Sequence, residues 1–477
     1  MLPSIPQLSD YDVSKDYGFL PQEPPLESLP QAYYRPWENV ARNLQGLILT
    51  KRIRGVVDNL PILSTTYLET DAEWRRAYMV LAFISHAYVW GGDRPAERVP
   101  PSISIPFIAT CNRLEVPTVA TYAAVVLWNY KPLFDDEPVD SLENLYTLNT
   151  FTGSLDESWF YLVSVAIEAR GAPIIPLMLH AIQAARNGDR ATVTECLRSF
   201  AERLDELGSL LVRMYENCDP HVFYHRIRPF LAGSKNMSDA GLPHGVIFDT
   251  GSGTDDYVQY SGGSNAQSSI IQFFDLVLGI EHRPTGSAVK QPEGSPPPPP
   301  SKNFIHDMRT YMPGPHARFL EHVSQIANIR QFVNGHKHDR ALATAFDACL
   351  AMLRAFRDKH IQMVSRYIIV KSRESRNSQS GSPRPERLNI ANSKDSKTGD
   401  ERKNLKGTGG TALIPFLKQA RDETGEPAID AWARRLLNNG PGVDAGVRMG
   451  KMGEKMEIVG LAGVWSVDDS DGGICHW

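Results

Sequence analysis

The sequence is poor in cysteine and contains no closely spaced cysteine pair. Among 477 residues there are five cysteines, all far apart: Cys111, Cys196, Cys218, Cys349 and Cys475. This spacing excludes a C-x-x-C zinc or redox motif and argues against a disulfide framework. We therefore expect reduced thiols, which are typical of cytoplasmic proteins.

The sequence also lacks long hydrophobic runs and an excess of one charge. No uninterrupted apolar stretch reaches about 18 residues, so we expect no transmembrane helix. The N-terminal M-L-P-S-I-P-Q-L-S-D-Y-D has no basic region followed by an apolar run, so we expect no signal peptide. The net charge is −5, with 50 basic and 55 acidic residues, which gives no electrostatic reason to expect nucleic acid or an anionic membrane as a partner.

Helical periodicity is present along most of the chain, whereas alternating strand patterns are not convincing. We therefore predict an all-α fold. The predicted helical segments are 36–61, 71–90, 119–130, 157–170, 174–186, 191–215, 267–278, 304–311, 315–328, 347–370 and 412–424. Residues 91–106 contain Gly-Gly and several prolines and are expected to break regular structure.

Composition divides the chain into two helical domains and an extension. The turn-rich segment 131–152 predicts a boundary between a smaller N-terminal domain (1–150) and a larger one (151–425). Segment 371–406 is polar, with almost no apolar residues, so we expect a flexible loop. Five consecutive prolines at 296–300 predict an exposed polyproline spacer. Residues 426–477 have no assigned structure.

One helix places a histidine among core residues. In D-A-C-L-A-M-L-R-A-F-R-D-K-H-I-Q-M-V-S-R-Y, apolar residues recur every three or four positions, and His360 falls on the same stripe. A neutral imidazole in an apolar wall can be the axial ligand of a haem iron. The alternative is a core histidine bonded to a backbone carbonyl, and spacing alone does not exclude it. His86, in an earlier helix, is interpreted as structural.

Two other features carry weaker signals. His221 and His225 are four residues apart and could share a metal, but no carboxylate or cysteine completes a ligand set at useful spacing. The glycine-rich loop 249–266 enters a helix, as phosphate-binding loops do. It lacks a Walker lysine and a preceding strand, so a nucleotide site is not favoured.

Three motifs resemble the indoleamine 2,3-dioxygenase family. They are S-G-G-S-N-A-Q-S-S-I-I-Q (261–272), F-I-H-D-M-R-T-Y-M-P-G-P-H (304–316) and R-D-K-H-I-Q-M-V-S-R-Y (357–367), in the family order. The resemblance covers about residues 15–425. It implies an all-α haem b protein, with haem in the larger domain, that cleaves the indole C2–C3 bond of L-tryptophan with dioxygen to give N-formylkynurenine, the first step of the kynurenine route to NAD.

The resemblance also implies site residues. His360 matches the proximal iron ligand, Arg357 an arginine near a haem propionate, and Asp275 the acid that pairs with it. Gly263 and Ser264 match the loop over the haem, with Ser264 and Ser164 on the substrate side. The implied substrate-binding residues are Tyr122, Phe160, Phe223, Arg228 and Thr408, the last in a mobile loop.

The residue chemistry agrees with this expectation. A cation suits the anionic edge of haem, an arginine suits a substrate carboxylate, and aromatic walls suit an indole. The distal residues include no obvious strong acid or base, which does not suit peroxidase chemistry. Two departures from the family, Asn265 and Ser234, and the added C-terminal extension leave substrate preference open.

Two alternative functions remain. One is a relative with weak activity or with another indoleamine as substrate, and the other is a haem sensor or interaction protein. The expected partners are an indoleamine, dioxygen and an electron donor. We expect a cytoplasmic monomer that binds neither nucleic acid nor membrane.

Overall fold

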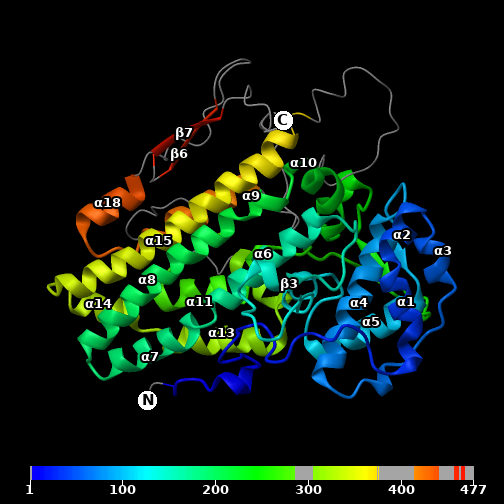
Figure 1. The fold of residues 1–477 in the computed structure, drawn as a ribbon, viewed down its shortest axis with the longest axis horizontal. Coiled ribbons are helices and arrows are strands. Elements are labelled where there is room, and N and C mark those ends of the chain that lie inside the picture. Colours follow the sequence, from blue (N-terminus) through cyan, green and yellow to red (C-terminus); the bar gives the residue numbers. More distant parts are fainter. Residues whose placement is uncertain are drawn as a thin grey trace.

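Two groups of helices lie side by side in the computed structural model (Figure 1). The structure describes residues 3–284, 304–372, 374 and 413–437 in full, and residues 438–439, 456–460 and 463–467 by their backbone. Helices dominate these residues, and the strands are few and short. The predicted all-α class is confirmed.

The larger group is built around two long helices that pack along each other, α8 (Arg190–Val212) and α15 (Arg340–Val364). The predicted stripe on α15 is fully buried at Phe346, Cys349 and Leu353. Cys349 Sγ donates to the carbonyl of Leu197 on α8 at 3.0 Å. Beyond Leu353 the same stripe faces a cavity. The residues of one continuous helical pattern therefore pack in the core in the first part of α15 and line the cavity in the second part.

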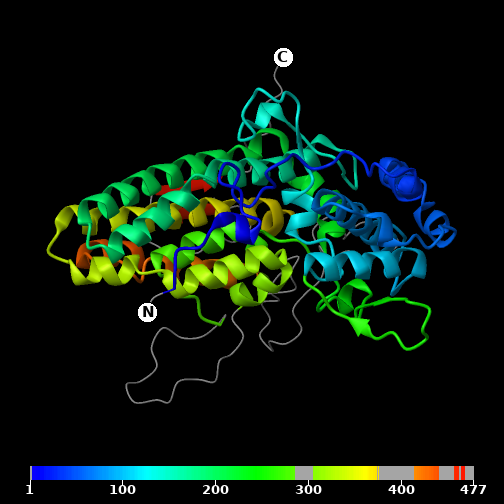
Figure 2. The ribbon, with the colours of Figure 1, turned by 90° about the horizontal axis from the view of Figure 1, so that it is seen from below.

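The rest of the larger group surrounds this pair (Figures 1 and 2). Its main helices are α6 (Leu155–Gly171), α7 (Ile174–Arg186), α11 (Ser269–Leu278), α13 (Gly314–Ile326) and α17 (Leu413–Thr424). Shorter helices are α9 (Met214–Asn217), α10 (Pro220–Val222), α12 (Phe304–Met308), α14 (Ile329–Gly335) and α18 (Ala431–Asn439).

Helices α6 and α7 form the most apolar stretch of the described chain. Leu155–Arg186 spans 32 residues and is long and apolar enough to cross a membrane by composition alone. However, 78% of its most apolar window is buried inside the protein. A helix that is hydrophobic all round belongs in a core, and most residues of α6 and α7 are buried.

The smaller group is centred on α4 (Asp71–Trp90), which is buried on all sides from Ala77 to Val89. Its start is fixed by a capping box, in which Thr70 and Glu73 each accept a backbone N–H from the other. His86 Nδ1 bonds to the carbonyl of Phe230 at 2.8 Å, and Nε2 accepts the amide of Ala120 at 2.9 Å. The structural interpretation of His86 is therefore confirmed.

Two predictions in this group were wrong. Segment 36–61 is three helices, α1 (Arg35–Arg42), α2 (Leu44–Leu49) and α3 (Ile53–Asp58). Asn43, with φ −105° and ψ 14°, separates the first two, and Lys51, with a left-handed φ of 58°, separates the last two. Segment 91–106 was expected to be irregular, yet α5 (Pro101–Leu114) begins inside it. Pro101 occupies the first helical position, where no N–H is needed, and Pro106 is accommodated within the helix.

The N-terminal arm crosses from the smaller group to α13 (Figure 2). Phe19 is 1% exposed and packs with its ring centroid 5.8 Å from that of Phe319. Tyr11 Oη bonds to His322 Nδ1 at 2.7 Å, and the Asp12 carboxylate pairs with Arg75 on α4. The arm therefore ties the two groups together, although it has little regular structure.

Short strands complete the described chain. β1 (Arg98–Val99) pairs in parallel with β4 (Val246–Phe248), which pairs antiparallel with β5 (Tyr257–Val258). β2 (Lys131–Pro132) pairs with β3 (Leu145–Tyr146). β6 (Met456–Gly460) and β7 (Gly463–Val467) form a hairpin in the extension that the sequence patterns did not indicate.

Candidate functional site

A cavity of about 250 Å³ lies between α6, α11, α15 and α17. Three π-helical turns also border it, at Ala123–Leu127, Phe223–Ile227 and Ser365–Val370. Such turns are rare and occur often at functional sites, because they re-aim side chains that a regular helix would direct elsewhere. The cavity is therefore the candidate site of the described chain.

Nearly all residues that the sequence analysis selected line this one cavity. They are Tyr122, Phe160, Ser164, Phe223, Arg228, Gly263, Ser264, Asp275, Arg357 and His360. They come from positions 122 to 360 of the chain, so only the fold brings them together. Thr408, the remaining candidate, and most of the predicted flexible loop 371–406 lie outside the described residues.

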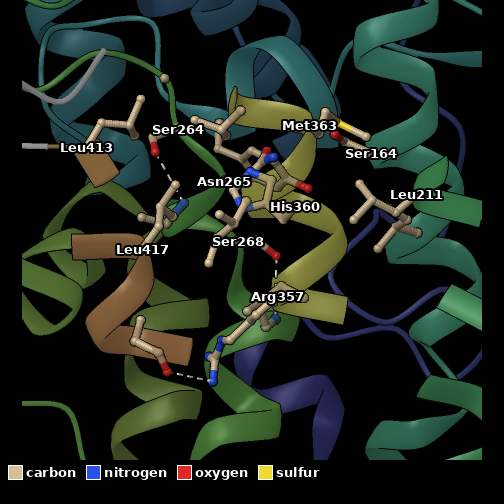
Figure 3. Close-up of a pocket in the computed structure, with 18 of the residues that line it drawn as sticks. Ser164, Leu211, Ser264, Asn265, Ser268, Arg357, His360, Met363, Leu413 and Leu417 are labelled. Atoms are coloured by element: carbon tan, nitrogen blue, oxygen red, sulfur yellow. Dashed lines mark hydrogen bonds between the residues drawn. The ribbon is translucent and has the colours of Figure 1, made fainter. Parts of the chain in front are cut away.

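His360 projects from α15 into the cavity (Figure 3). Burial, and next the positive charge of Arg357, lower the pKa of the imidazole to about 4. The ring is therefore neutral at pH 7 and keeps a lone pair on one nitrogen. Within the described residues, neither ring nitrogen has a hydrogen-bond partner, so the core-histidine alternative, which needs a carbonyl partner, is not what the structure has.

Arg357 lies one turn before His360 and is held by α11 and α17. Its Nη2 donates to both carboxylate oxygens of Asp275, at 2.7 Å each. Its Nη1 donates to the hydroxyl of Thr424 and, at 3.5 Å, to the carbonyl of Ala420. The guanidinium is thus fixed at the edge of the cavity (Figure 3).

Asp275 belongs to a larger buried network. Burial disfavours its charge, but Arg357 and His282 outweigh that effect and lower the pKa of Asp275. His282 bonds in turn to Glu423 on α17. The sequence analysis did not select His282 or Glu423, because they lie 141 positions apart and no local motif connects them.

The opposite part of the cavity is aromatic with one buried cation. The ring centroids of Phe160 and Phe223 are 4.7 Å apart, and the two ring planes are tilted by 46°. Arg228 is only 1% exposed, and its guanidinium lies 5.6 Å from the centre of the Tyr224 ring. Burial lowers the pKa of Arg228 to about 10, so it remains positive at neutral pH.

Glu168 is a buried acid on α6, one turn after Ser164, and does not itself line the cavity. Glu168 Oε1 accepts the Tyr122 hydroxyl at 3.0 Å and the Ser268 hydroxyl at 2.7 Å. Burial raises the pKa of Glu168 to about 7. The sequence analysis found no obvious strong acid or base among the distal residues and missed Glu168, whose signal was a lone carboxylate in the apolar run of α6.

The glycine-rich loop supplies the wall at Gly263, Ser264 and Asn265. Ser264 Oγ accepts the amide of Ala266 at 3.3 Å. A Cβ at Gly263 would lie 3.3 Å from the carbonyl of Ala120, so the close approach of the loop favours glycine. Asn265 brings an amide to the cavity, as expected, whereas Ser234 lines a separate, much smaller cavity.

Several wall residues were missed or interpreted as core only. Leu211 and Met214 follow the helical spacing of core residues in α8 and α9, a pattern that indicates packing only, but both line the cavity. Helix α17 contributes Leu413, Phe416, Leu417 and Ala420. In Figure 3, Leu413 and Leu417 lie on one side of His360, with Ser164 and Leu211 on the other.

The fold and the cavity together define an all-α protein with one large ligand cavity among its described residues. The family model described as Indoleamine 2,3-dioxygenase matches residues 7–427. The chain therefore belongs to the indoleamine 2,3-dioxygenase family, and it is an oxidoreductase of the dioxygenase class. Helix α18 and the β6–β7 hairpin lie beyond the matched residues.

Individual relatives cover nearly the same region. An indoleamine 2,3-dioxygenase of Saccharomyces cerevisiae is 40% identical over 436 residues, covering 88% of this chain and 93% of the relative. A 6-hydroxytryptophan 2,3-dioxygenase of Fusarium equiseti is 38% identical, covering 87% and 96%. Indoleamine 2,3-dioxygenase 1 of Rattus norvegicus is 32% identical, covering 89% and 96%.

Proposed function

We propose that this protein uses haem b to open the indole ring of L-tryptophan, adding both atoms of dioxygen across C2–C3 to give N-formylkynurenine. One observation carries the proposal. A neutral histidine free to bind iron, a pair of aromatic rings and a buried arginine line the same cavity. This set suits a flat metal cofactor together with an aromatic amino acid.

The cavity residues fit haem. His360 presents an unbonded imidazole nitrogen, and its low pKa leaves the lone pair available to iron. Arg357 is a fixed cation at the cavity edge, where a propionate can be met. Apolar side chains from α15 and α17, such as Phe356, Val364 and Leu417, supply a surface for the porphyrin.

Haem, when bound, supplies ferrous iron that activates dioxygen. The protein's own residues do the rest. Arg228 binds the substrate carboxylate, and Phe160 and Phe223 hold the indole between apolar surfaces. Ser164 and Ser264 place hydroxyls at the substrate side, and the apolar wall excludes water, which protects a reactive site from side reactions. Thr408 is proposed to contact the amino-acid end.

The remaining partners follow from this chemistry. The enzyme needs dioxygen and an electron donor that keeps the iron ferrous. We propose that it acts in the cytoplasm, since the four described cysteines are free and buried. We also propose that it is a monomer.

Hydroxylated tryptophan is a second candidate substrate. The relative from Fusarium equiseti is named for 6-hydroxytryptophan and is nearly as similar as the yeast relative. Ser164 offers a hydroxyl in the cavity wall that can bond to a ring hydroxyl. Competition between L-tryptophan and 6-hydroxytryptophan in one reaction measures the ratio of kcat/KM and decides between them.

Product formation tests the proposal directly. The purified, haem-loaded protein with a reductant and L-tryptophan should form N-formylkynurenine under air and none without oxygen. Tryptophan should also perturb the haem absorbance spectrum. A haem spectrum without product would instead indicate a haem sensor or interaction protein, and failure to bind haem would refute both.

A further inference from the structure

Four buried charged groups connect α11, the segment that follows it, α15 and α17. His282 Nε2 bonds to Asp275 Oδ2 at 3.0 Å, and its Nδ1 bonds to Glu423 Oε2 at 2.7 Å. Asp275 also holds Arg357. The side chains of His282, Asp275 and Glu423 are each at most 6% exposed.

The geometry fixes the charge of His282. A carboxylate only accepts hydrogen bonds, and here two carboxylates meet the two ring nitrogens of one imidazole. Both nitrogens must then donate, which only the imidazolium can do. A neutral His282 would leave one buried carboxylate oxygen facing a nitrogen lone pair, so His282 acts as a second cation beside Arg357.

Glu423 anchors α17 through several further bonds. Its Oε1 accepts the amide of Arg283 at 3.0 Å and the side-chain amide of Gln419 at 2.9 Å. Gln419 in turn donates to the carbonyls of Arg283 and Pro284. The segment after α11 and the C-terminal half of α17 are thereby held together, with His282 at the centre.

Two parts of the cavity depend on this anchor. Helix α17 carries four cavity-lining residues, named above. It also supplies the two Nη1 acceptors of Arg357, the hydroxyl of Thr424 and the carbonyl of Ala420. If α17 shifted, the wall would open, and Arg357 would keep only Asp275.

We propose that His282 is a positioning residue: by bonding to Asp275 and Glu423 at once, it docks α17 against α11 and fixes Arg357 at the cavity edge. It touches neither the cavity nor its proposed ligand. His282 acts indirectly, by positioning Arg357 and the part of the cavity wall that α17 forms. Loss of the His282 side chain should therefore loosen α17 while leaving the rest of the fold intact.

The bridge should depend on pH in a defined direction. Burial disfavours the imidazolium, but the charges and hydrogen bonds of Asp275 and Glu423 outweigh burial and raise the pKa of His282 above its usual 6.5. Its contribution is therefore complete below pH 6.5 and is lost as the pH rises through the raised pKa. The charged groups that face the bridge are Asp275, Glu423, Arg357, Arg283, Arg309 and Glu426.

Hydrogen–deuterium exchange of full-length apoprotein tests the docking. The measured quantity is the exchange rate of the 413–424 amides in His282→Gln relative to wild type at the same pH. At pH 6.5 we expect the variant to exchange roughly tenfold faster, the size expected for losing charge-assisted bonds. The ratio should fall toward one as the pH rises through the raised pKa of His282.

Two further variants separate positioning from packing. His282→Gln leaves Glu423 buried without its cation, so His282→Gln/Glu423→Gln should recover most of the lost protection. Glu281→Gln is the matched control, since Glu281 is the adjacent residue, exposed, and pairs with Arg330 away from α17. It should leave the exchange ratio at one.

A second readout rests on the proposed haem cofactor. Haem transfer from His282→Gln to an excess of an apoglobin acceptor should be several-fold faster than from wild type, and Glu281→Gln should match wild type. A ratio of one at pH 6.5, a ratio constant with pH, or additive effects in the double variant would each overturn the proposal. Wild-type protein that never binds haem would refute the proposed function instead, and the exchange arm would still decide the role of His282.

Discussion

His360 is the residue on which the proposed cofactor depends. The variant His360→Ala removes the one cavity imidazole, so it should lose most of its haem while keeping its helical content, because the side chain contributes no hydrogen bond to the described fold. Haem absorbance and far-ultraviolet circular dichroism measure the two effects. His336→Ala, at the end of α14 and away from the cavity, is the control and should bind haem normally. An intact five- or six-coordinate spectrum in His360→Ala would contradict the assignment.

Arg228 is expected to recognise the substrate carboxylate. Losing a charge-assisted contact removes about 1.5–3 kcal/mol, so Arg228→Leu should bind L-tryptophan at least roughly tenfold more weakly. Haem content should be unaffected, because the propionate contact is assigned to Arg357. Tryptamine lacks the carboxylate, and its binding should change far less than that of tryptophan. Equal losses for the two ligands would show that Arg228 supports the fold and does not read the substrate.

Glu168 should make stability depend on pH. Its pKa is raised by burial from 4.5 to about 7, so the folded protein holds a proton that the unfolded chain releases. Stability contributed by this site therefore falls as the pH rises from 4.5 to 7, by up to roughly 3 kcal/mol. Glu168→Gln cannot titrate at this site. Its free energy of unfolding, measured by urea denaturation of the apoprotein, should therefore rise relative to that of wild type between pH 4.5 and 7. For the control Glu202→Gln, at an exposed position, the plot of unfolding free energy against pH should run parallel to that of wild type. A parallel plot for Glu168→Gln would refute the assigned pKa.

Sequence patterns identified single site residues that have a strong local signal. They missed residues whose role depends on a partner far away in the sequence. His360 stands out because it interrupts an apolar stripe, and the family motifs supply its neighbours. Glu168 bonds to Tyr122, 46 positions away, and His282 bonds to Glu423, 141 positions away. Their importance comes from burial and pairing, and neither is encoded in nearby residues.

Among the elements, helix α4 owes its start to the Thr70–Glu73 capping box. Thr70→Ala removes one of the two reciprocal bonds and should destabilise the protein by about 0.5–2 kcal/mol. Urea denaturation at fixed pH measures this loss. Ser64→Ala, which removes a similar cap from a single exposed turn, should have a much smaller effect. Equal losses would mean that the cap of α4 is no more important than a surface turn.

The same element shows why some helices are readable from sequence. Thr70, Glu73 and a regular apolar pattern define the start and the course of α4, and its predicted range 71–90 is confirmed. Helix α5 was missed because prolines at 101 and 106 were interpreted as breaks, although tertiary packing overrides that preference. The π-helical turns at the cavity have no sequence signature at all, since an inserted residue in a helix is stabilised by the packing around it.

For the whole molecule, the N-terminal arm is one of the connections between the two helical groups. Phe19→Ala removes a ring that is 1% exposed and packs against α13. The free energy of unfolding should fall by about 3–5 kcal/mol. Thermal or urea unfolding gives the size of the loss. Tyr33→Ala removes a ring that is 40% exposed and should cost far less. A small effect for Phe19→Ala would mean that the arm is only loosely attached.

The predicted boundary near residue 150 remains a prediction. One continuous hydrophobic cluster extends from Val13 to Leu437 and includes residues from both helical groups. Sequence composition indicates where a chain turns, but the extent of packing across a boundary depends on surfaces that only the fold creates.

The order in which the cavity walls occur in the chain has a consequence for biosynthesis. Tyr122 is made early, and the wall formed by α17 is made only after more than 400 other residues. At ~5–20 residues per second, a ribosome needs roughly 20–80 s to reach α17. A nascent chain therefore has an incomplete cavity until α17 has been made. A ligand that contacts both walls can be enclosed only after that point.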